Sequence, residues 1–68
     1  MVIQSVLFDR NIWTLKKAKD WLKWRGMFQF VDVKPNFWRF RQEDPSKFKT
    51  LKIKKIGNGI EFVLGYND

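Results

Sequence analysis

Residues 36–42 read Asn-Phe-Trp-Arg-Phe-Arg-Gln, and the aromatic and arginine residues of this stretch alternate at the spacing of a β-strand. Successive side chains of a strand point to opposite faces. Trp38 and Phe40 therefore share one face, and Phe37, Arg39 and Arg41 share the other. The first pair has the character of a core, whereas the second set suits a surface that holds a phosphate or stacks on a base.

The preceding residues extend this strand into a hairpin. Phe28 to Val33 forms the partner strand, and Pro35-Asn36 forms the connection. The pairing predicts that Asp32 lies opposite Arg39 on the outer face as a cross-strand charge pair. The core face of the hairpin then carries Val31, Val33, Trp38 and Phe40.

A second hairpin is predicted around Asn58-Gly59, the strongest short hairpin signal in the chain. Lys49 to Ile56 and Ile60 to Tyr66 flank this turn. Closing a two-residue turn there pairs Ile53 with Leu64, Leu51 with Tyr66, Lys54 with Val63 and Lys52 with Gly65. In this register Lys52 and Lys54 point outward, and the inward residues are Leu51, Ile53, Phe62, Leu64 and Tyr66.

The first third of the chain predicts a strand followed by a helix. Val2 to Phe8 is a short apolar run typical of a strand, and Thr14 is an N-cap candidate for a helix over Leu15 to Arg25, closed by Gly26. At 100° per residue, Leu15, Ala18, Trp21 and Leu22 form one apolar arc. Lys16, Lys19 and Lys23 fall together on another side. Trp24 lies away from the apolar arc and is expected to be exposed.

Together these elements predict a single α+β domain over residues 1–68, in the order β-α-β-β-β-β. A single helix covers only one face of an antiparallel sheet, so the other face is expected to meet solvent or a partner. The predicted open face carries Asp32 and Glu61 as partial counter-charges to its cations. Its binding residues are Phe37, Arg39, Arg41, Lys52 and Lys54.

Composition narrows the class of partner. Fourteen Lys and Arg against seven Asp and Glu give the 68 residues a net charge of +7. This balance favours a nucleic acid, an acidic protein or an anionic membrane, with simple solubility as the alternative. Membrane binding is disfavoured because no helix combines a broad apolar face with a uniformly basic one. The apolar runs are short and interrupted by Lys or Arg, which predicts an intracellular, non-secreted domain.

The residue types do not favour an enzyme. The chain has no His and no Cys, so the commonest acid–base residue and the thiol nucleophile are both missing. The adjacent Glu43 and Asp44 precede Pro45 and suit a turn rather than a metal site. Gly57-Asn58-Gly59 lacks the following helix of a phosphate loop. We therefore expect no catalytic residue, cofactor or metal.

Binding is the better supported class. Arginines and lysines on one pleated surface would contact phosphates, and Phe37 and Phe30 would stack on unpaired bases. The helix stripe of Lys16, Lys19 and Lys23 is a second candidate phosphate track or a solvated helix face. Arg39 and Arg41 have an equally good structural explanation, because Asp32 and Gln42 can engage them.

A wider pattern joins several of these residues: Trp21-Leu22, Gly26, Arg39-Phe40-Arg41-Gln42 and Ile56-Gly57-Asn58-Gly59-Ile60. Over about Trp13 to Gly65 the chain resembles a small module of uncharacterised activity met in bacteriophage and large-virus proteins. The resemblance implies a compact α+β module of viral or phage origin with genome-associated, virion-associated or host-directed roles. It implies no catalytic residues.

Two functional hypotheses follow. The first is a non-enzymatic nucleic-acid-binding protein of a virus or phage, acting on DNA or RNA in the host cytoplasm or nucleus or in the virion. The second is a protein-interaction module, either a minor virion component or an inhibitor of a host nucleic-acid enzyme. Trp24 would anchor its interface, with an acidic protein surface or a second copy as partner. In a dimer packed sheet to sheet, Arg39 and Arg41 would be interface residues.

Overall fold

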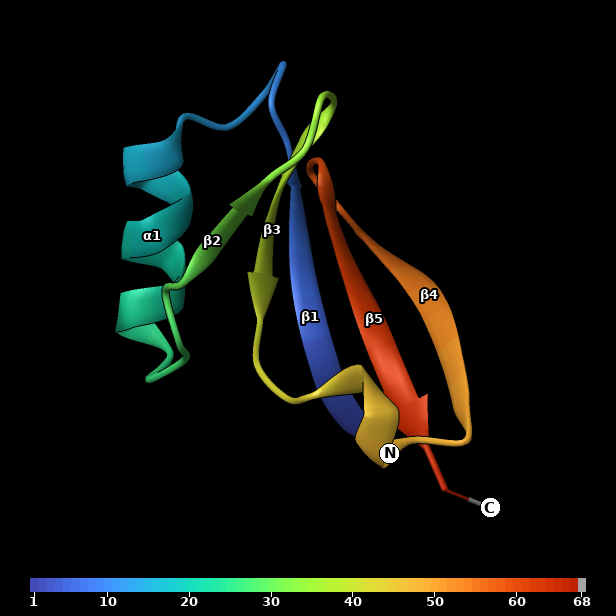
Figure 1. The fold of residues 1–68 in the computed structure, drawn as a ribbon. Coiled ribbons are helices and arrows are strands. Elements are labelled where there is room, and N and C mark those ends of the chain that lie inside the picture. Colours follow the sequence, from blue (N-terminus) through green and yellow to red (C-terminus); the bar gives the residue numbers. More distant parts are fainter. Residues whose placement is uncertain (68) are drawn as a thin grey trace.

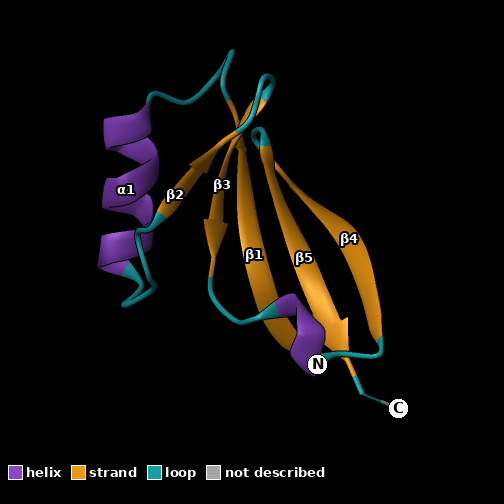
Figure 2. Ribbon diagram, viewed as in Figure 1, coloured by secondary structure: helices purple, strands orange, loops and turns teal. Residues whose placement is uncertain are grey.

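One α-helix and a five-stranded antiparallel sheet make up the fold, as a computed structural model that describes residues 1–67 shows (Figures 1 and 2). The sheet order is β2-β3-β1-β5-β4, and the predicted α+β chain order β-α-β-β-β-β is confirmed. The elements are β1 (Val2–Asp9), α1 (Leu15–Trp24), β2 (Val31–Val33), β3 (Phe37–Arg41), the 3-10 helix η1 (Pro45–Lys47), β4 (Thr50–Gly57) and β5 (Ile60–Tyr66).

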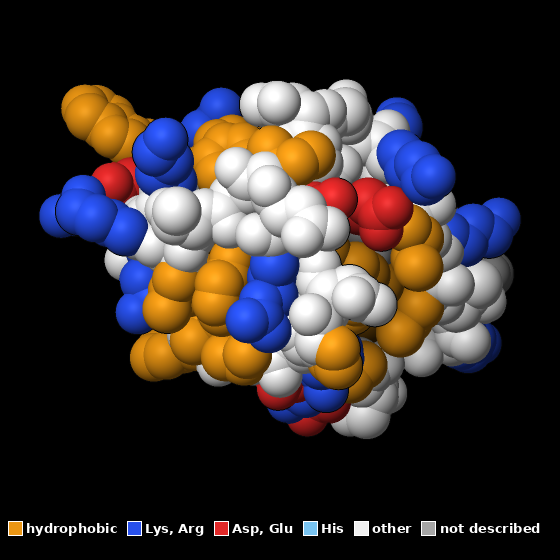
Figure 3. All heavy atoms as spheres, turned by 90° about the horizontal axis from the view of Figure 1, so that it is seen from above, with side chains coloured by type: hydrophobic (Ala, Val, Ile, Leu, Met, Phe, Trp, Pro, Cys, Tyr) orange, Lys and Arg blue, Asp and Glu red, His pale blue; other side chains and the backbone are white. Residues whose placement is uncertain are grey.

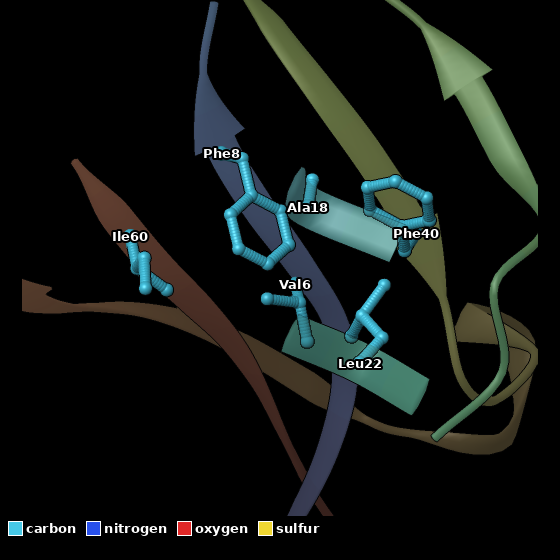
Figure 4. Packing of buried hydrophobic residues seen from close by; sticks show 6 residues of the cluster. All are labelled: Val6, Phe8, Ala18, Leu22, Phe40 and Ile60. Atoms are coloured by element: carbon cyan, nitrogen blue, oxygen red, sulfur yellow. The ribbon is translucent and has the colours of Figure 1, made fainter. Parts of the chain in front are cut away.

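Helix α1 forms where its caps predict. The Thr14 hydroxyl accepts a hydrogen bond from the Lys17 amide at 3.2 Å, and Gly26 follows the last turn with φ of +67°. Ala18 and Leu22 are fully buried. Figure 4 shows that both point from the helix at a cluster of sheet residues: Val6, Phe8, Phe40 and Ile60.

The helix covers only part of its side of the sheet. In Figure 1, α1 lies beside β2, and β4 lies at the far side of the sheet. Every residue of β4 is exposed. One side of β4 and part of β5 are therefore left accessible on the face that carries the helix. Within residues 1–67, no helix has both the length and the apolar character needed to cross a membrane.

The first predicted hairpin is confirmed in its register, but its first strand covers only Val31–Val33 instead of Phe28 to Val33. Val33, predicted in the core, is 55% exposed. Val31 pairs with Phe40, Asp32 with Arg39 and Val33 with Trp38. The Asp32 carboxylate forms its ion pair with Lys34, at 3.3 Å, rather than with Arg39. Before β2, the chain is held by the side-chain amide of Gln42, which accepts from the Phe28 N–H and donates to the Phe28 carbonyl, both at 2.8 Å.

In the second hairpin the turn is confirmed and the predicted register is wrong. Asn58 and Gly59 both have positive φ, at 56° and 76°, as a primed two-residue turn requires. A β-bulge between Lys55 and Gly57 then adds one residue to β4. Gly57 takes φ of +107° at this bulge, a conformation that glycine adopts without strain.

The bulge reverses the two faces of β4. Because the side-chain period of a strand is two, a shift of one residue moves each side chain to the opposite face. Lys54 pairs with Phe62 and Lys52 with Leu64, whereas Ile53 pairs with Val63 and Leu51 with Gly65. Phe62 and Leu64 lie on the helix side as predicted, but Leu51 and Ile53 do not join them.

A buried polar pair marks the start of β1. Gln4 and Ser5 are fully buried, and the Ser5 hydroxyl donates to the Gln4 side-chain oxygen at 2.6 Å. The Gln4 amide donates in turn to the Glu43 carbonyl at 2.8 Å. At this end of the sheet the Phe48 ring lies against Gly65, so closely that a Cβ on Gly65 would meet it at 2.5 Å.

Candidate nucleic-acid interface

The cross-strand pairs assign the predicted binding residues to two different faces. Residues paired across an antiparallel sheet lie on the same face. Lys54, Phe62, Val6 and Phe40 form one such row, and Val6 and Phe40 belong to the core under the helix. Lys52 and Lys54 therefore lie on the helix side. The prediction that they share a face with Phe37, Arg39 and Arg41 is wrong, and its cause is the bulge in β4.

On the helix side, cations and aromatic rings form one continuous strip. The Arg25 guanidinium lies over the Trp21 ring, 3.7 Å from its centroid. The Trp21 ring meets the Phe62 ring edge to face with centroids 6.2 Å apart. Phe62 is the cross-strand partner of Lys54. The strip thus runs from the end of α1 across β5 to β4.

The strip continues along β4 and β5 toward their other ends. Lys52 lies two residues before Lys54, and its ammonium is 5.5 Å from the centroid of the half-buried Tyr66 ring. Lys17 lies one turn before Trp21 on the same flank of the helix. We call the set the basic helix-side surface, and its members are Lys17, Trp21, Arg25, Lys52, Lys54, Phe62 and Tyr66.

This surface is strongly cationic. Glu61 is the one carboxylate of β4 and β5, and it lies on the other face because it pairs with Lys55 and Leu7. The two strands therefore present lysines and aromatic rings on the helix side without an acidic side chain. Figure 3, which views the molecule from above, shows hydrophobic and basic side chains next to one another, with acidic groups in small clusters.

The opposite face of the sheet, which we call the open face, is nearly balanced in charge. It keeps Phe37, Arg39 and Arg41 together as predicted, in the pairs that join β3 to β1. Alternation places six charged residues of the strands on it: Arg39, Arg41, Lys55, Asp9, Asp32 and Glu61. Lys34, which is paired with Asp32 at 3.3 Å, adds a seventh. The face thus carries four cations and three carboxylates, so it is much less basic than the helix side.

A hollow of about 360 Å³ lies at one end of the open face. Leu7 and Phe37 line it together with the charged residues Asp9, Lys55 and Glu61. Within residues 1–67, no group of three acidic side chains is close enough to hold a metal ion. The mixed charges of the hollow single out no ligand class.

The lysine stripe of the helix lies on its other flank. At 100° per residue, Lys16, Lys19 and Lys23 fall on the side of Ala18 and Leu22 opposite to Trp21. Lys16 is engaged in an ion pair with Asp20 at 3.1 Å. The stripe is therefore separate from the basic helix-side surface, and a role in binding stays a prediction.

Trp24 is 87% exposed, which confirms the predicted exposure. It lies beside Asp20 and Lys23 on the solvent side of α1, where the three residues line a shallow hollow. Its role as an interface anchor stays a prediction.

Sequence reasoning missed part of this surface. Trp21 was assigned to the core alone, although the half-buried ring also joins the surface, and Arg25 was assigned only to the helix end. Gly57 is the sequence signal from which the correct face of Lys52 and Lys54 could have been predicted. A glycine directly before an Asn-Gly turn is typical of a bulge, and a bulge changes the register of the strand that contains it.

Comparisons of the chain with protein-family models, with curated proteins and with solved structures found no match. The resemblance to bacteriophage and large-virus modules, with the viral origin and location that it implies, therefore stays a prediction.

Proposed function

We propose that this protein is a non-enzymatic nucleic-acid-binding protein, and that it binds single strands through the basic helix-side surface. The observation that carries the proposal is a series of neighbouring side chains. Arg25 contacts Trp21, Trp21 contacts Phe62, and Phe62 is the cross-strand partner of Lys54. Such a surface combines phosphate-binding cations with rings that accept unpaired bases.

The charges support an electrostatic mode of binding. Contacts of Lys and Arg with phosphates release counterions, and this release supplies most of the affinity for nucleic acid. Arg25, Lys52 and Lys54 are exposed, so their charged groups are accessible to a phosphate backbone. The net charge of +7 on the whole chain adds a long-range attraction.

The aromatic residues favour a single strand over a duplex. Trp21, Phe62 and Tyr66 are each half-buried, so they are held by packing and remain partly accessible. Because Arg25 already lies over the Trp21 ring, Phe62 and Tyr66 are the rings on which a base would stack. Stacking of a base on such a ring contributes about 1–3 kcal/mol. Bases in a duplex are already stacked on one another and do not offer their faces to a flat surface of this kind.

The test is fluorescence anisotropy with single-stranded oligo(dT), oligo(U) and a mixed-sequence DNA duplex across a series of salt concentrations. We expect the single strands to bind more tightly than the duplex. Replacing Lys52 and Lys54 together by Gln should weaken binding and lower the slope of log K against log salt by about 1.4, because each lost phosphate contact removes about 0.7.

The matched control is the replacement of Lys16 and Lys23 by Gln, which removes the same charge from the other flank of α1. An equal loss with this control would show that net charge or the lysine stripe determines binding as much as Lys52 and Lys54 do, and would contradict the site. Absence of binding by the wild-type chain at physiological salt would contradict the proposed function.

The exposure of Trp24 supports a second candidate function, a protein-interaction module. An exposed Trp is a frequent anchor of interfaces. In this case the Trp24→Ala variant should lose binding to an acidic protein partner while keeping its affinity for oligo(dT). Loss of oligo(dT) binding alone would contradict this second candidate.

A further inference from the structure

One row of side chains across the open face has an unusual order of charges. From β2 to β4 the cross-strand partners are Asp32, Arg39, Leu7, Glu61 and Lys55. Their charges are negative, positive, neutral, negative and positive. The row has Leu7 at its centre, on the middle strand of the sheet, and each charge has the opposite charge at the mirrored position.

Such a row is complementary to a reversed copy of itself. A twofold axis that runs parallel to β1, in front of Leu7, generates a second copy whose sheet faces the first. The β2 side of one copy then lies over the β4 side of the other. Arg39 then lies over Glu61 of the partner subunit, and Asp32 lies over the partner's Lys55. Because a twofold contact occurs twice, the row would form two Arg39–Glu61 pairs. It would also bring Lys55 close to each Asp32, which is already paired with Lys34 of its own chain at 3.3 Å.

In the neighbouring row, the same rotation brings apolar residues together at the two ends, and it places Arg41 over the partner's Val63. The cross-strand partners of this row from β3 to β4 are Arg41, Ser5, Val63 and Ile53. Phe30 directly precedes β2, and the alternation of β2, continued by one residue, extends this row to Phe30 on the β2 side. The rotation places Phe30 over the partner's Ile53, and both are largely exposed in the single chain, at 76% and 65%.

We propose that the open face binds a second copy of this chain, in a face-to-face dimer with a twofold axis along β1. Two sheets packed in this way lie about 10 Å apart with their strands at about −30°. The same axis places the partner's Phe37 over the turn at Gly59, beside the hollow on the open face. The helix sides of both copies stay outward.

Two features of the open face fit a second copy better than a polyanion. The open face carries nearly equal numbers of cations and carboxylates, whereas the helix side is basic. Apolar side chains lie at both lateral ends of the open face: Phe28 and Phe30 near β2, and Leu51 and Ile53 on β4. Their exposed area is removed from water when the two ends meet.

The test is sedimentation equilibrium of the wild-type chain without nucleic acid, over a range of concentrations. We expect the mass to rise from 8.3 kDa to twice that value. The Arg39→Glu substitution places a second negative charge opposite Glu61 of the partner subunit. The Glu61→Arg substitution places a second positive charge opposite Arg39 of the partner subunit. Each should weaken the dimer at least about tenfold. The double variant exchanges both charges and should restore the dimer to within about threefold.

The double variant distinguishes a contact of Arg39 and Glu61 between two copies from an interaction of these residues within one chain. Arg39 and Glu61 lie on β3 and β5, with β1 between them, so their direct coupling within a chain is weak. Ile53→Lys is a further variant, because its side chain is largely exposed in the single chain and folding does not depend on it. It should also weaken the dimer, whereas Trp24→Ala on the helix should leave it unchanged.

A wild-type chain that stays at 8.3 kDa at millimolar concentration would overturn the dimer. Failure of the double variant to restore association would also overturn it. A dimer that is lost with Trp24→Ala and kept with Ile53→Lys would overturn it as well. None of these results depends on nucleic acid, so failure of the dimer and failure of the proposed binding function are distinguished.

Discussion

Lys54 lies directly across from Phe62, one residue away from the partner that the Asn58-Gly59 turn alone would give it. This single pairing joins the lysines of β4 to the aromatic rings of the helix side. It also sends Ile53 to the open face. The chemistry of both sides of the sheet therefore depends on the bulge at Gly57.

Gly57→Ala should destabilise the fold by about 1–3 kcal/mol, because an L residue is strained at φ of +107°. Nothing lies within 4 Å of the added Cβ, so a collision cannot account for the cost. Urea unfolding followed by circular dichroism measures it. Gly26→Ala is the matched control, since its φ of +67° is left-handed helical and also has free space. A smaller loss at Gly57 than at Gly26 would contradict the argument.

Tyr66→Ala should weaken the binding of oligo(dT) by about 1–3 kcal/mol, because it removes a ring on which a base stacks beside Lys52. Tyr66→Phe keeps the ring and should bind like the wild type. Anisotropy titrations at fixed salt compare the two variants. Equal affinities of both variants would show that Tyr66 does not contact a base.

Gln42→Ala should destabilise the segment before β2, since the Gln42 amide makes two hydrogen bonds with the Phe28 backbone. At about 0.5–1.5 kcal/mol for each bond, the expected loss is about 1–3 kcal/mol. Hydrogen exchange of the Phe28 amide should become faster. Gln29→Ala, at an exposed neighbouring position, is the control and should leave that exchange unchanged.

The pKa of Asp44 should lie below its ordinary value of 3.8, chiefly because its carboxylate accepts a hydrogen bond from the Ser46 N–H. The folded state then binds the proton less well than the unfolded state. The resulting stabilisation is present above pH 3.8 and is lost as the pH falls through the folded pKa. A carboxyl titration followed by NMR measures the value, and a pKa at or above 3.8 would contradict the hydrogen bond.

Local signals in the sequence were sufficient for most of the fold. Thr14 and Gly26 mark the ends of the helix, and the alternation from Phe37 to Arg41 gives both the strand and its core face. These features depend on neighbours in sequence, which a period of two or of 3.6 residues records directly. The exposure of Trp24 follows from the same geometry.

The candidate site was harder to predict because it depends on relations between distant segments. One added residue in β4 decided which cations share a face, and the turn signal at Asn58-Gly59 carries no information about it. Arg25 belongs to the surface because its guanidinium lies over the Trp21 ring. Trp21 in turn contacts Phe62, which lies on a strand far along the chain. Hydrophobic periodicity shows that Trp21 faces inward but does not show which strand it meets.

The two outermost strands limit how the molecule can grow into larger assemblies. A free strand edge invites further strands to add, and lysine side chains and short edges oppose that addition. The outer edge of β4 carries Lys52, Lys54 and Lys55, and β2 at the other margin is only three residues long. Sheet extension into fibres is therefore disfavoured at both margins, which leaves the faces as the surfaces for association, and a twofold face contact closes at two chains.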